Sequence, residues 1–154
     1  MPSYPDIGDL APEISLPSTE GQFSLHERLE EGAVLLVFYP NDRTLVCTKQ
    51  LCNYRDNLSR FSEYKVQVVG INQDDMESHE LFTDKYKFCF PLLSDPARRA
   101  SNAYGALLAL FKLRRVLVLV GEDGRVWWRH SELRVFHREA EELFEIIAEL
   151  RAGS

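Results

Sequence analysis

The sequence predicts an α/β fold in which a mixed central sheet is covered by helices on both faces. Residues 33–39 are continuously apolar and end at Pro40, as a strand buried on both faces would. Residues 66–71 predict a second buried strand, and a helical pattern lies between the two. A strand, a helix and a strand in this order form a βαβ unit, so the two strands should be parallel.

The helix of this unit is predicted from the spacing of its apolar residues. Cys47, Leu51, Tyr54, Leu58 and Phe61 recur at intervals of four, three, four and three, which traces one face of a single helix. This face should pack against the sheet, because an amphipathic helix buries its apolar stripe.

The chain on either side of the unit predicts the rest of the fold. Residues 1–25 are rich in Pro, Gly and Asp and predict irregular chain with one or two edge strands. After the unit we expect a helix, a short strand, a weaker helix, a hairpin with its turn at Asp123-Gly124, and a last helix, at residues 76–87, 91–93, 97–108, 115–130 and 138–151. This order fits a thioredoxin-like fold. Because no repeat or linker divides the chain, we expect one domain over residues 1–154.

Composition and charge argue against several classes of protein. The net charge is −6 and the Lys and Arg residues are scattered, so the basic stripe of a nucleic-acid-binding protein is missing. No apolar run approaches the roughly 20 residues that a membrane span needs, and the N-terminus lacks the pattern of a secretory signal. We therefore expect a cytoplasmic protein that binds neither nucleic acid nor membrane.

The three cysteines are too few for a disulfide-stapled fold. A structural zinc site needs four ligands, usually from two close pairs, whereas Cys47 and Cys52 form one widely spaced pair and Cys89 is distant. We therefore expect no metal and no cofactor. Cys89 lies between Phe88 and Phe90 and is expected to pack in the core, with a third redox thiol as the alternative.

Cys47 lies in the first turn of the predicted helix. The unpaired backbone N–H groups of that turn and the positive end of the helix dipole favour the thiolate, which is the nucleophilic form of cysteine. Because Cys47 shares the inward stripe with Leu51 and Tyr54, we expect it on the floor of a pocket. The alternative is a plain core residue, since free cysteine is among the most buried residue types.

Cys52 is a second thiol on the same helix. It lies roughly 140° around the helix from Cys47, on the polar side, where packing explains a cysteine poorly. A reactive thiol with a second thiol nearby is how a sulfenic acid becomes a disulfide. Five residues apart on a helix, the two Cα atoms are separated by roughly 8 to 9 Å, whereas a disulfide needs about 7 Å or less. The geometry predicts that oxidation unwinds the first turns of this helix.

The stretch around Cys47 resembles a known family. Pro40-x3-Thr44-x2-Cys47 is similar to the active-site motif of peroxiredoxins, and its continuation to Arg55-Asp56 through Cys52 resembles the Q-type branch, also called bacterioferritin comigratory protein. Further similarity follows in order along nearly the whole chain, at Ser78-His79, residues 90–95, Tyr104-Gly105 and Arg115.

The resemblance implies a role for each motif residue. Cys47 would attack the peroxide, Cys52 would resolve the sulfenic acid, and Thr44 would hydrogen-bond thiolate and peroxide. Pro40 would shield the site from water, and Arg115 would hold the thiolate and polarise the peroxide. The implied substrates are hydrogen peroxide and small organic hydroperoxides, and a thioredoxin-type reductant would reopen the Cys47–Cys52 disulfide. Relatives of this type are often monomeric, so a monomer is expected.

The sequence departs from the family pattern at Leu45-Val46, where relatives usually carry Pro and often Gly. A positive φ at Val46 would be strained, because the residue is β-branched. Arg114 precedes Arg115 and would point to the opposite face of a strand, and the family position favours Arg115.

Several other side chains have expected structural roles. His79 is expected to be half-buried, and the remaining histidines, His26, His130 and His137, are expected on the surface. Trp127 and Trp128 should face opposite sides of a strand, one in the core and the other available for docking. Asp74-Asp75 should cap the helix that follows.

Two alternative functions are also compatible with the sequence. One is a one-cysteine peroxidase, in which an external thiol resolves Cys47. The other is a redox-sensing binding protein that uses the unwinding of the helix as its signal. The set of Pro40, Thr44 and Arg115 favours a peroxidase, because a sensor has less need of a pocket that polarises peroxide.

Overall fold

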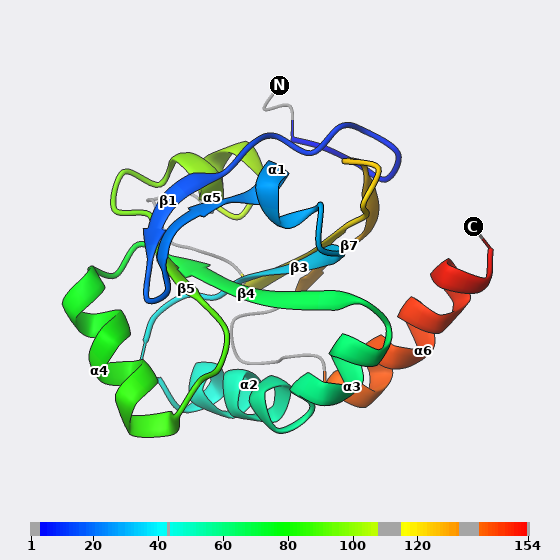
Figure 1. Ribbon diagram of the computed structural model, residues 1–154. Coiled ribbons are helices and arrows are strands. Elements are labelled where there is room, and N and C mark those ends of the chain that lie inside the picture. The colour runs from blue at the N-terminus through cyan, green and yellow to red at the C-terminus, as the bar shows by residue number, and fades with distance from the viewer. Residues whose placement is uncertain (1–3, 43, 108–114, 133–138, 154) are drawn as a thin grey trace.

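The computed structural model describes residues 4–42, 44–107, 115–132 and 139–153, and Figure 1 shows their arrangement. Seven strands form one mixed sheet in the order β2-β1-β5-β4-β3-β6-β7. The strands are β1 (Ser15–Ser18), β2 (Gly21–Ser24), β3 (Ala33–Phe38), β4 (Val66–Asn72), β5 (Leu92–Ser94), β6 (Arg115–Val120) and β7 (Val126–Glu132). The helices are α1 (Leu25–Arg28), α2 (Leu45–Asp56), α3 (Leu58–Glu63), α4 (Met76–Tyr86), α5 (Arg99–Ala103) and α6 (Ala140–Ala152). The α/β class and the mixed sheet are confirmed, and the single-domain expectation stays a prediction.

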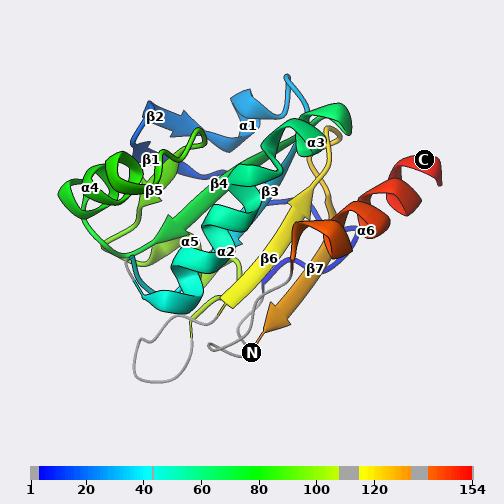
Figure 2. The ribbon, with the colours of Figure 1, turned by 90° about the horizontal axis from the view of Figure 1, so that it is seen from below.

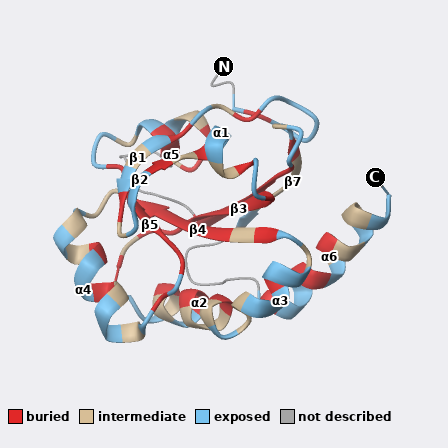
Figure 3. Cartoon of the chain, in the orientation of Figure 1, coloured by how far each residue is buried: buried red, intermediate tan, exposed pale blue. Residues whose placement is uncertain are grey.

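The centre of the sheet is the predicted βαβ unit. β3 and β4 pair in parallel, from Ala33 opposite Val66 to Phe38 opposite Ile71, and β4 pairs in parallel with β5. β6 runs antiparallel beside β3 and connects through a hairpin to β7. Every residue of β3 is buried, as Figure 3 shows for the middle of the sheet, because helices cover both of its faces.

Two apolar clusters fill the space on the two faces of the sheet. The larger joins α2, α3, α4 and α6 to one face, and the smaller joins α1 and α5 to the other. Alternation along β3 supplies both clusters, since Leu35 and Val37 belong to the larger and Leu36 and Phe38 to the smaller. Figure 2 shows α2 lying over the strands, between α4 and α6. The larger cluster therefore packs against the inner face of α2, the helix that carries the two predicted redox cysteines.

The predicted single helix after β3 is wrong in one respect, because it is broken at Asn57. α2 ends at Asp56 and α3 starts at Leu58, while Asn57 has φ −111° and ψ 14°. The Asn57 side chain donates to the carbonyl oxygen of Asn53 at 2.8 Å, and the Asn57 backbone N–H turns to the carbonyl of Tyr54. A side chain that takes over a helical carbonyl competes with the helix ladder. The apolar stripe nevertheless continues, since Phe61 of α3 is fully buried.

The helix α5 is shorter than predicted. α5 spans five residues because the chain ends it in a Schellman motif: Gly105 has φ +74°, and the N–H of Ala106 donates to the carbonyl of Ser101. The predicted end of that helix at Leu108, and the predicted start of the last helix at Arg138, lie outside the described residues. None of the helices in the described ranges is long and apolar enough to cross a membrane.

The two tryptophans do not face opposite sides, contrary to the prediction. In the β6–β7 ladder Leu119 is opposite Trp128 and Val120 is opposite Val126, so Trp127 is the extra residue of a β-bulge. Both tryptophans are partly buried against the larger cluster. The bulge therefore breaks the strict alternation on which the prediction depended.

The bulge generates a prediction about Gly121, which lies directly against the Trp127 ring. A Cβ at position 121 would overlap Trp127 ring atoms, so Gly121→Ala should displace the ring and destabilise the fold by about 1–3 kcal/mol. Urea denaturation and a red shift of tryptophan emission would measure both effects. Gly153→Ala is the matched control, because its Cβ would meet an ordinary contact at 3.5 Å. An unchanged stability and emission for Gly121→Ala would contradict this packing.

Candidate active site

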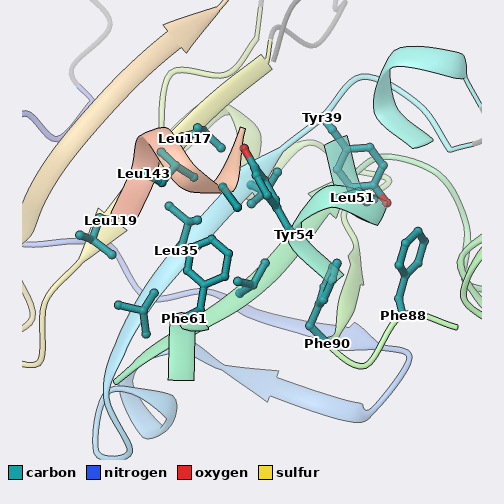
Figure 4. Packing of buried hydrophobic residues seen from close by; sticks show 14 of the residues in the cluster. Leu35, Tyr39, Leu51, Tyr54, Phe61, Phe88, Phe90, Leu117, Leu119 and Leu143 are labelled. Atoms are coloured by element: carbon teal, nitrogen blue, oxygen red, sulfur yellow. The ribbon is translucent and has the colours of Figure 1, made fainter. Parts of the chain in front are cut away.

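Cys47 occupies the first turn of α2, as predicted. Thr44 is the N-cap residue, α2 begins at Leu45, and the N–H of Thr48 donates to the Thr44 carbonyl at 2.9 Å. The Cys47 side chain is 1% exposed and belongs to the larger cluster with Leu51 and Tyr54. Figure 4 shows Leu51 and Tyr54 pointing into that cluster. The Cys47 thiol thus lies on the buried side of the first turn of α2, where backbone N–H groups without a partner in the helix favour negative charge.

A buried cation contacts this thiol. Arg115, at the start of β6, is 1% exposed and places its Nη2 at 3.2 Å from the Cys47 Sγ. A guanidinium is permanently charged and stabilises a thiolate beside it. The predicted contact is therefore made by Arg115, while Arg114 lies outside the described residues.

Gln50 and Tyr54 complete this arrangement, and the sequence reasoning missed both roles. The Arg115 Nη1 donates to Gln50 Oε1 at 2.5 Å, and the Gln50 amide donates to the Tyr54 hydroxyl at 3.2 Å. Cys47, Gln50 and Tyr54 are three and four residues apart on α2, so they share one helix face, from which Cys47 and Gln50 contact Arg115. A buried glutamine on an apolar stripe was the available signal, because a buried amide needs partners.

The loop between β3 and α2 carries the other two motif residues. Pro40 is buried, whereas Thr44 is exposed. Within the part of the chain that the structure describes, the Thr44 hydroxyl donates its hydrogen bond to the carbonyl oxygen of Asn41, at 3.4 Å. The structure therefore does not join Thr44 to Cys47, and the roles expected of Thr44 and Pro40 stay predictions.

Asp42 connects this loop to the rest of the sheet. Its Oδ1 accepts from the Tyr39 hydroxyl at 2.7 Å and from the Asn72 amide at 3.1 Å, and its Oδ2 accepts from Ser78 Oγ at 2.7 Å. Nδ1 of His79 lies 2.7 Å from the same Oδ2. Burial opposes ionisation, but the contacts with His79, Tyr39 and Ser78 prevail and lower the pKa of Asp42.

His79 is fully buried, so the expectation of a half-buried histidine is wrong. Its Nε2 lies 2.9 Å from the Leu93 carbonyl oxygen, while Asp42 holds the other ring nitrogen. Asp75 caps α4 as predicted, accepting from the N–H of Ser78 at 2.9 Å. Asp74 instead accepts from the N–H of Asp42 at 2.7 Å.

The other histidines differ from one another. His26 is exposed as predicted, whereas His130 is partly buried and stacks on Trp128 with ring centroids 5.7 Å apart. His137 lies outside the described residues. Among the residues that the structure describes, no group of three or more His, Cys, Asp or Glu side chains could hold a metal ion.

Leu45 and Val46 cause no strain in the loop. Both belong to α2, and Val46 is not among the described residues with positive φ. The departure from the family pattern is accommodated because the helix starts one residue after Thr44, where a β-branched residue is allowed. Leu45 is left 70% exposed by this arrangement.

Cys52 is half-buried and packs against the larger cluster, so its placement on a purely polar face is wrong. Burial raises the pKa of the Cys52 thiol, with a smaller opposing effect from Arg55. Cys47, Cys52 and Cys89 are all free thiols, and α2 is continuous between the first two. The structure therefore represents the reduced form, in which the two thiols of α2 are held apart.

Cys89 is exposed, contrary to the expectation of core packing. Its neighbours Phe88 and Phe90 are both buried in the larger cluster. In extended chain consecutive side chains point to opposite sides, so burying the two phenylalanines turns Cys89 outward. Its Sγ lies 3.6 Å from the Lys87 carbonyl oxygen.

Comparison with known proteins gives consistent results. Residues 7–129 match the AhpC/TSA family. A putative peroxiredoxin bcp of Coxiella burnetii is 34% identical over 126 residues, which are 77% of this chain and 83% of that protein. A putative peroxiredoxin of Mycobacterium tuberculosis is 41% identical, covering 77% and 80% of the two chains. The chloroplastic peroxiredoxin Q of Sedum lineare is 38% identical over 104 residues, 68% of this chain and 56% of that one.

Solved structures share the whole fold. Peroxidoxin BcpB from Mycobacterium tuberculosis superimposes with a TM-score of 0.84 at 28% identity, covering 97% of this chain and 98% of that one. Peroxiredoxin Q of Xanthomonas campestris has a TM-score of 0.77 at 23% identity, over 90% of both chains, which supports the fold alone. These neighbours confirm the expected thioredoxin-like fold.

The burial of Cys52 predicts a shifted pH dependence for its alkylation. In a Cys47→Ser/Cys89→Ser protein, the rate of reaction with iodoacetamide should reach its midpoint at a higher pH in the folded than in the urea-denatured protein. The reason is that burial raises the pKa of Cys52, so its thiolate appears only at higher pH. Mass spectrometry across pH 7–11 measures both curves, and a midpoint at or below that of the denatured protein would contradict the prediction.

Proposed function

This chain belongs to the AhpC/TSA family, and from that premise we propose that it reduces hydrogen peroxide and small organic hydroperoxides through Cys47 and a Cys47–Cys52 disulfide. The protein is a thiol-dependent peroxidase of the peroxiredoxin bcp and Q type. The single observation that carries the proposed mechanism is the contact of the buried Arg115 guanidinium with the Cys47 Sγ at a helix N-terminus.

The first step is attack of the Cys47 thiolate on one oxygen of the peroxide. The O–O bond breaks, Cys47 becomes a sulfenic acid, and the other oxygen leaves as hydroxide or alkoxide and takes up a proton. Arg115 stabilises the thiolate before attack and the charge on the leaving oxygen during attack. Thr44 would turn its hydroxyl from Asn41 to the peroxide, and buried Pro40 would exclude water.

Gln50 and Tyr54 hold Arg115 in place for this step. The Gln50 carbonyl oxygen accepts from Nη1, which leaves Nη2 directed at Cys47. The Gln50 amide is fixed in turn by the Tyr54 hydroxyl. Because these groups are buried on α2 itself, unwinding of α2 would also release the guanidinium from its partner.

The second step joins the two cysteines. Cys52 attacks the sulfur of the Cys47 sulfenic acid, a disulfide forms, and water leaves. On intact α2 the Cα atoms are roughly 8 to 9 Å apart, which is beyond disulfide range. We therefore propose that α2 unwinds around Cys47 after oxidation, which would also expose the half-buried Cys52.

The cycle closes by thiol–disulfide exchange. A dithiol reductant of the thioredoxin type would attack the disulfide, pass through a mixed disulfide, and leave Cys47 and Cys52 reduced. We propose that the protein works as a monomer in the cytoplasm.

The role of Cys52 is tested by replacing it. Cys52→Ser should lose thioredoxin-dependent turnover, because the sulfenic acid of Cys47 cannot form the disulfide, while the first oxidation of Cys47 by hydrogen peroxide persists. Coupled NADPH consumption measures turnover, and stopped-flow fluorescence measures the first oxidation. Cys89→Ser is the matched control and should retain full turnover. Turnover that survives in Cys52→Ser would establish resolution by an external thiol instead.

The role of Arg115 is tested by the rate of Cys47 oxidation. Removing a preorganised charge from a buried site lowers rates by about 10²- to 10³-fold, so Arg115→Met should slow oxidation by that order. Arg125→Met, at an exposed arginine, should react as the wild type does. A rate within threefold of wild type in folded Arg115→Met, or a wild-type rate no faster than that of free cysteine, would refute the proposed mechanism.

A further inference from the structure

We propose that Asp42 and His79 form a positioning pair for Cys47. The pair anchors the loop between β3 and α2, so that the segment that rearranges in the catalytic cycle begins after residue 42 and not within β3. This inference rests on the proposed function, because it concerns the same cysteine and the same unwinding of α2.

The hydrogen bonds of His79 define its protonation. Its Nε2 faces the Leu93 carbonyl oxygen at 2.9 Å, and a carbonyl oxygen only accepts, so Nε2 carries a proton. Its Nδ1 faces Asp42 Oδ2 at 2.7 Å. Asp42 is a carboxylate at neutral pH, because its contacts hold its pKa below the usual range. Nδ1 must then donate as well, which makes His79 an imidazolium.

Asp42 and His79 are therefore a buried ion pair, with side chains 1% and 0% exposed. A buried pair of this kind is strongly disrupted when one partner is removed, because the remaining charge is left uncompensated. The same pair is far less sensitive to removal of both charges, provided that hydrogen-bonding groups of similar shape replace them.

The contacts of Asp42 fix the loop to several elements at once. Tyr39 follows β3, Asn72 ends β4, and Ser78 and His79 belong to α4, and all four side chains contact the Asp42 carboxylate. Through Nε2 of His79 the network also reaches β5. Residue 42 can leave this position only by breaking its contacts with Tyr39, with Asn72 of β4 and with α4, so it is a firm boundary.

A second boundary lies just beyond Cys52. The Asn53 side chain accepts from the N–H of Ala140 at 2.7 Å, at the start of α6. Tyr54 is fully buried, and Arg55 donates to the carbonyl oxygen of Tyr86, the last residue of α4. The ten residues 43–52 thus lie between two anchored ends. Both cysteines are inside this segment.

The position of Cys47 depends on the first of these anchors. One residue separates Asp42 from the N-cap Thr44, and Cys47 follows in the first turn of α2. A shift of residue 42 would therefore move the helix N-terminus relative to Arg115, which enters from β6. A misplacement of about 1 Å is enough to lower a rate by up to roughly 10²-fold.

Rates of Cys47 oxidation test the pair. Asp42→Asn and His79→Gln should each slow single-turnover oxidation by hydrogen peroxide by about 10- to 100-fold. The double variant should react faster than either single variant, because no uncompensated charge remains. Rates for both single variants within threefold of wild type would overturn the proposal. The absolute wild-type rate tests the peroxidase function separately.

A matched control separates positioning from stability. Asp95 is another buried carboxylate, 1% exposed, which accepts from the backbone N–H groups of Arg99 and Ser101 and so caps α5. Asp95→Asn should lower the melting temperature but leave the rate of Cys47 oxidation unchanged. An equal loss of rate in Asp95→Asn would mean that the effect is one of general stability, which would refute a positioning role for Asp42 and His79.

Hydrogen exchange of the wild-type protein tests the anchor at Asp42 without any substitution. Hydrogen exchange of the disulfide form, compared with the reduced form, should increase within residues 43–52 and stay unchanged within residues 38–42. Increased exchange in residues 38–42 would contradict the anchor at Asp42. Unchanged exchange in both ranges would refute the unwinding itself and, with it, this inference, while leaving the peroxide-dependent oxidation of Cys47 intact.

Discussion

The contact between the Arg115 guanidinium and the Cys47 Sγ is the interaction on which the site depends. A charged group with 1% exposure is unfavourable unless it has partners, and the partners of Arg115 include the Cys47 thiol and the amide of Gln50. β6 supplies the cation and α2 supplies its partners, so the site exists only when helix and sheet are packed together. Packing of the larger cluster is therefore a condition for this candidate site to form.

The same packing opposes the rearrangement that the proposed disulfide requires. Leu51 is fully buried, and exposing such a side chain costs about 1.5–3 kcal/mol. The bond between Arg115 and Gln50 would also be lost when α2 unwinds. Closure of the proposed disulfide would have to offset these free-energy costs. In the proposed cycle the helix would therefore rewind once a reductant has opened the disulfide.

The framework of the fold could be predicted from the sequence, because its elements are determined by residues that are neighbours along the chain. The apolar run of β3, the Asp123-Gly124 turn and the cap at Asp75 are all of this kind. The break at Asn57 and the bulge at Trp127 were missed, since each depends on hydrogen bonds or ladder register that periodicity does not contain.

Within the site, Cys47 and Arg115 followed from the family motif, and Gln50 could have been recognised from its place on the buried face of α2. The ion pair of Asp42 and His79 could not, because 37 residues separate its members and no spacing rule connects them. Cys89 was misplaced for a similar reason: which side of an extended segment is buried depends on the phenylalanines beside it.

The break at Asn57 divides the chain after β3 into two cooperative units. In a continuous helix, melting at one end spreads by loss of successive hydrogen bonds, because helix formation is cooperative. Here α2 ends at Asp56, and α3 holds Phe61 in the core independently. Opening of α2 can thus remain a sub-global event while the rest of the protein stays folded. In the proposed cycle, a catalyst that unwinds in every turnover thereby limits its exposure to proteases and aggregation to one short helix.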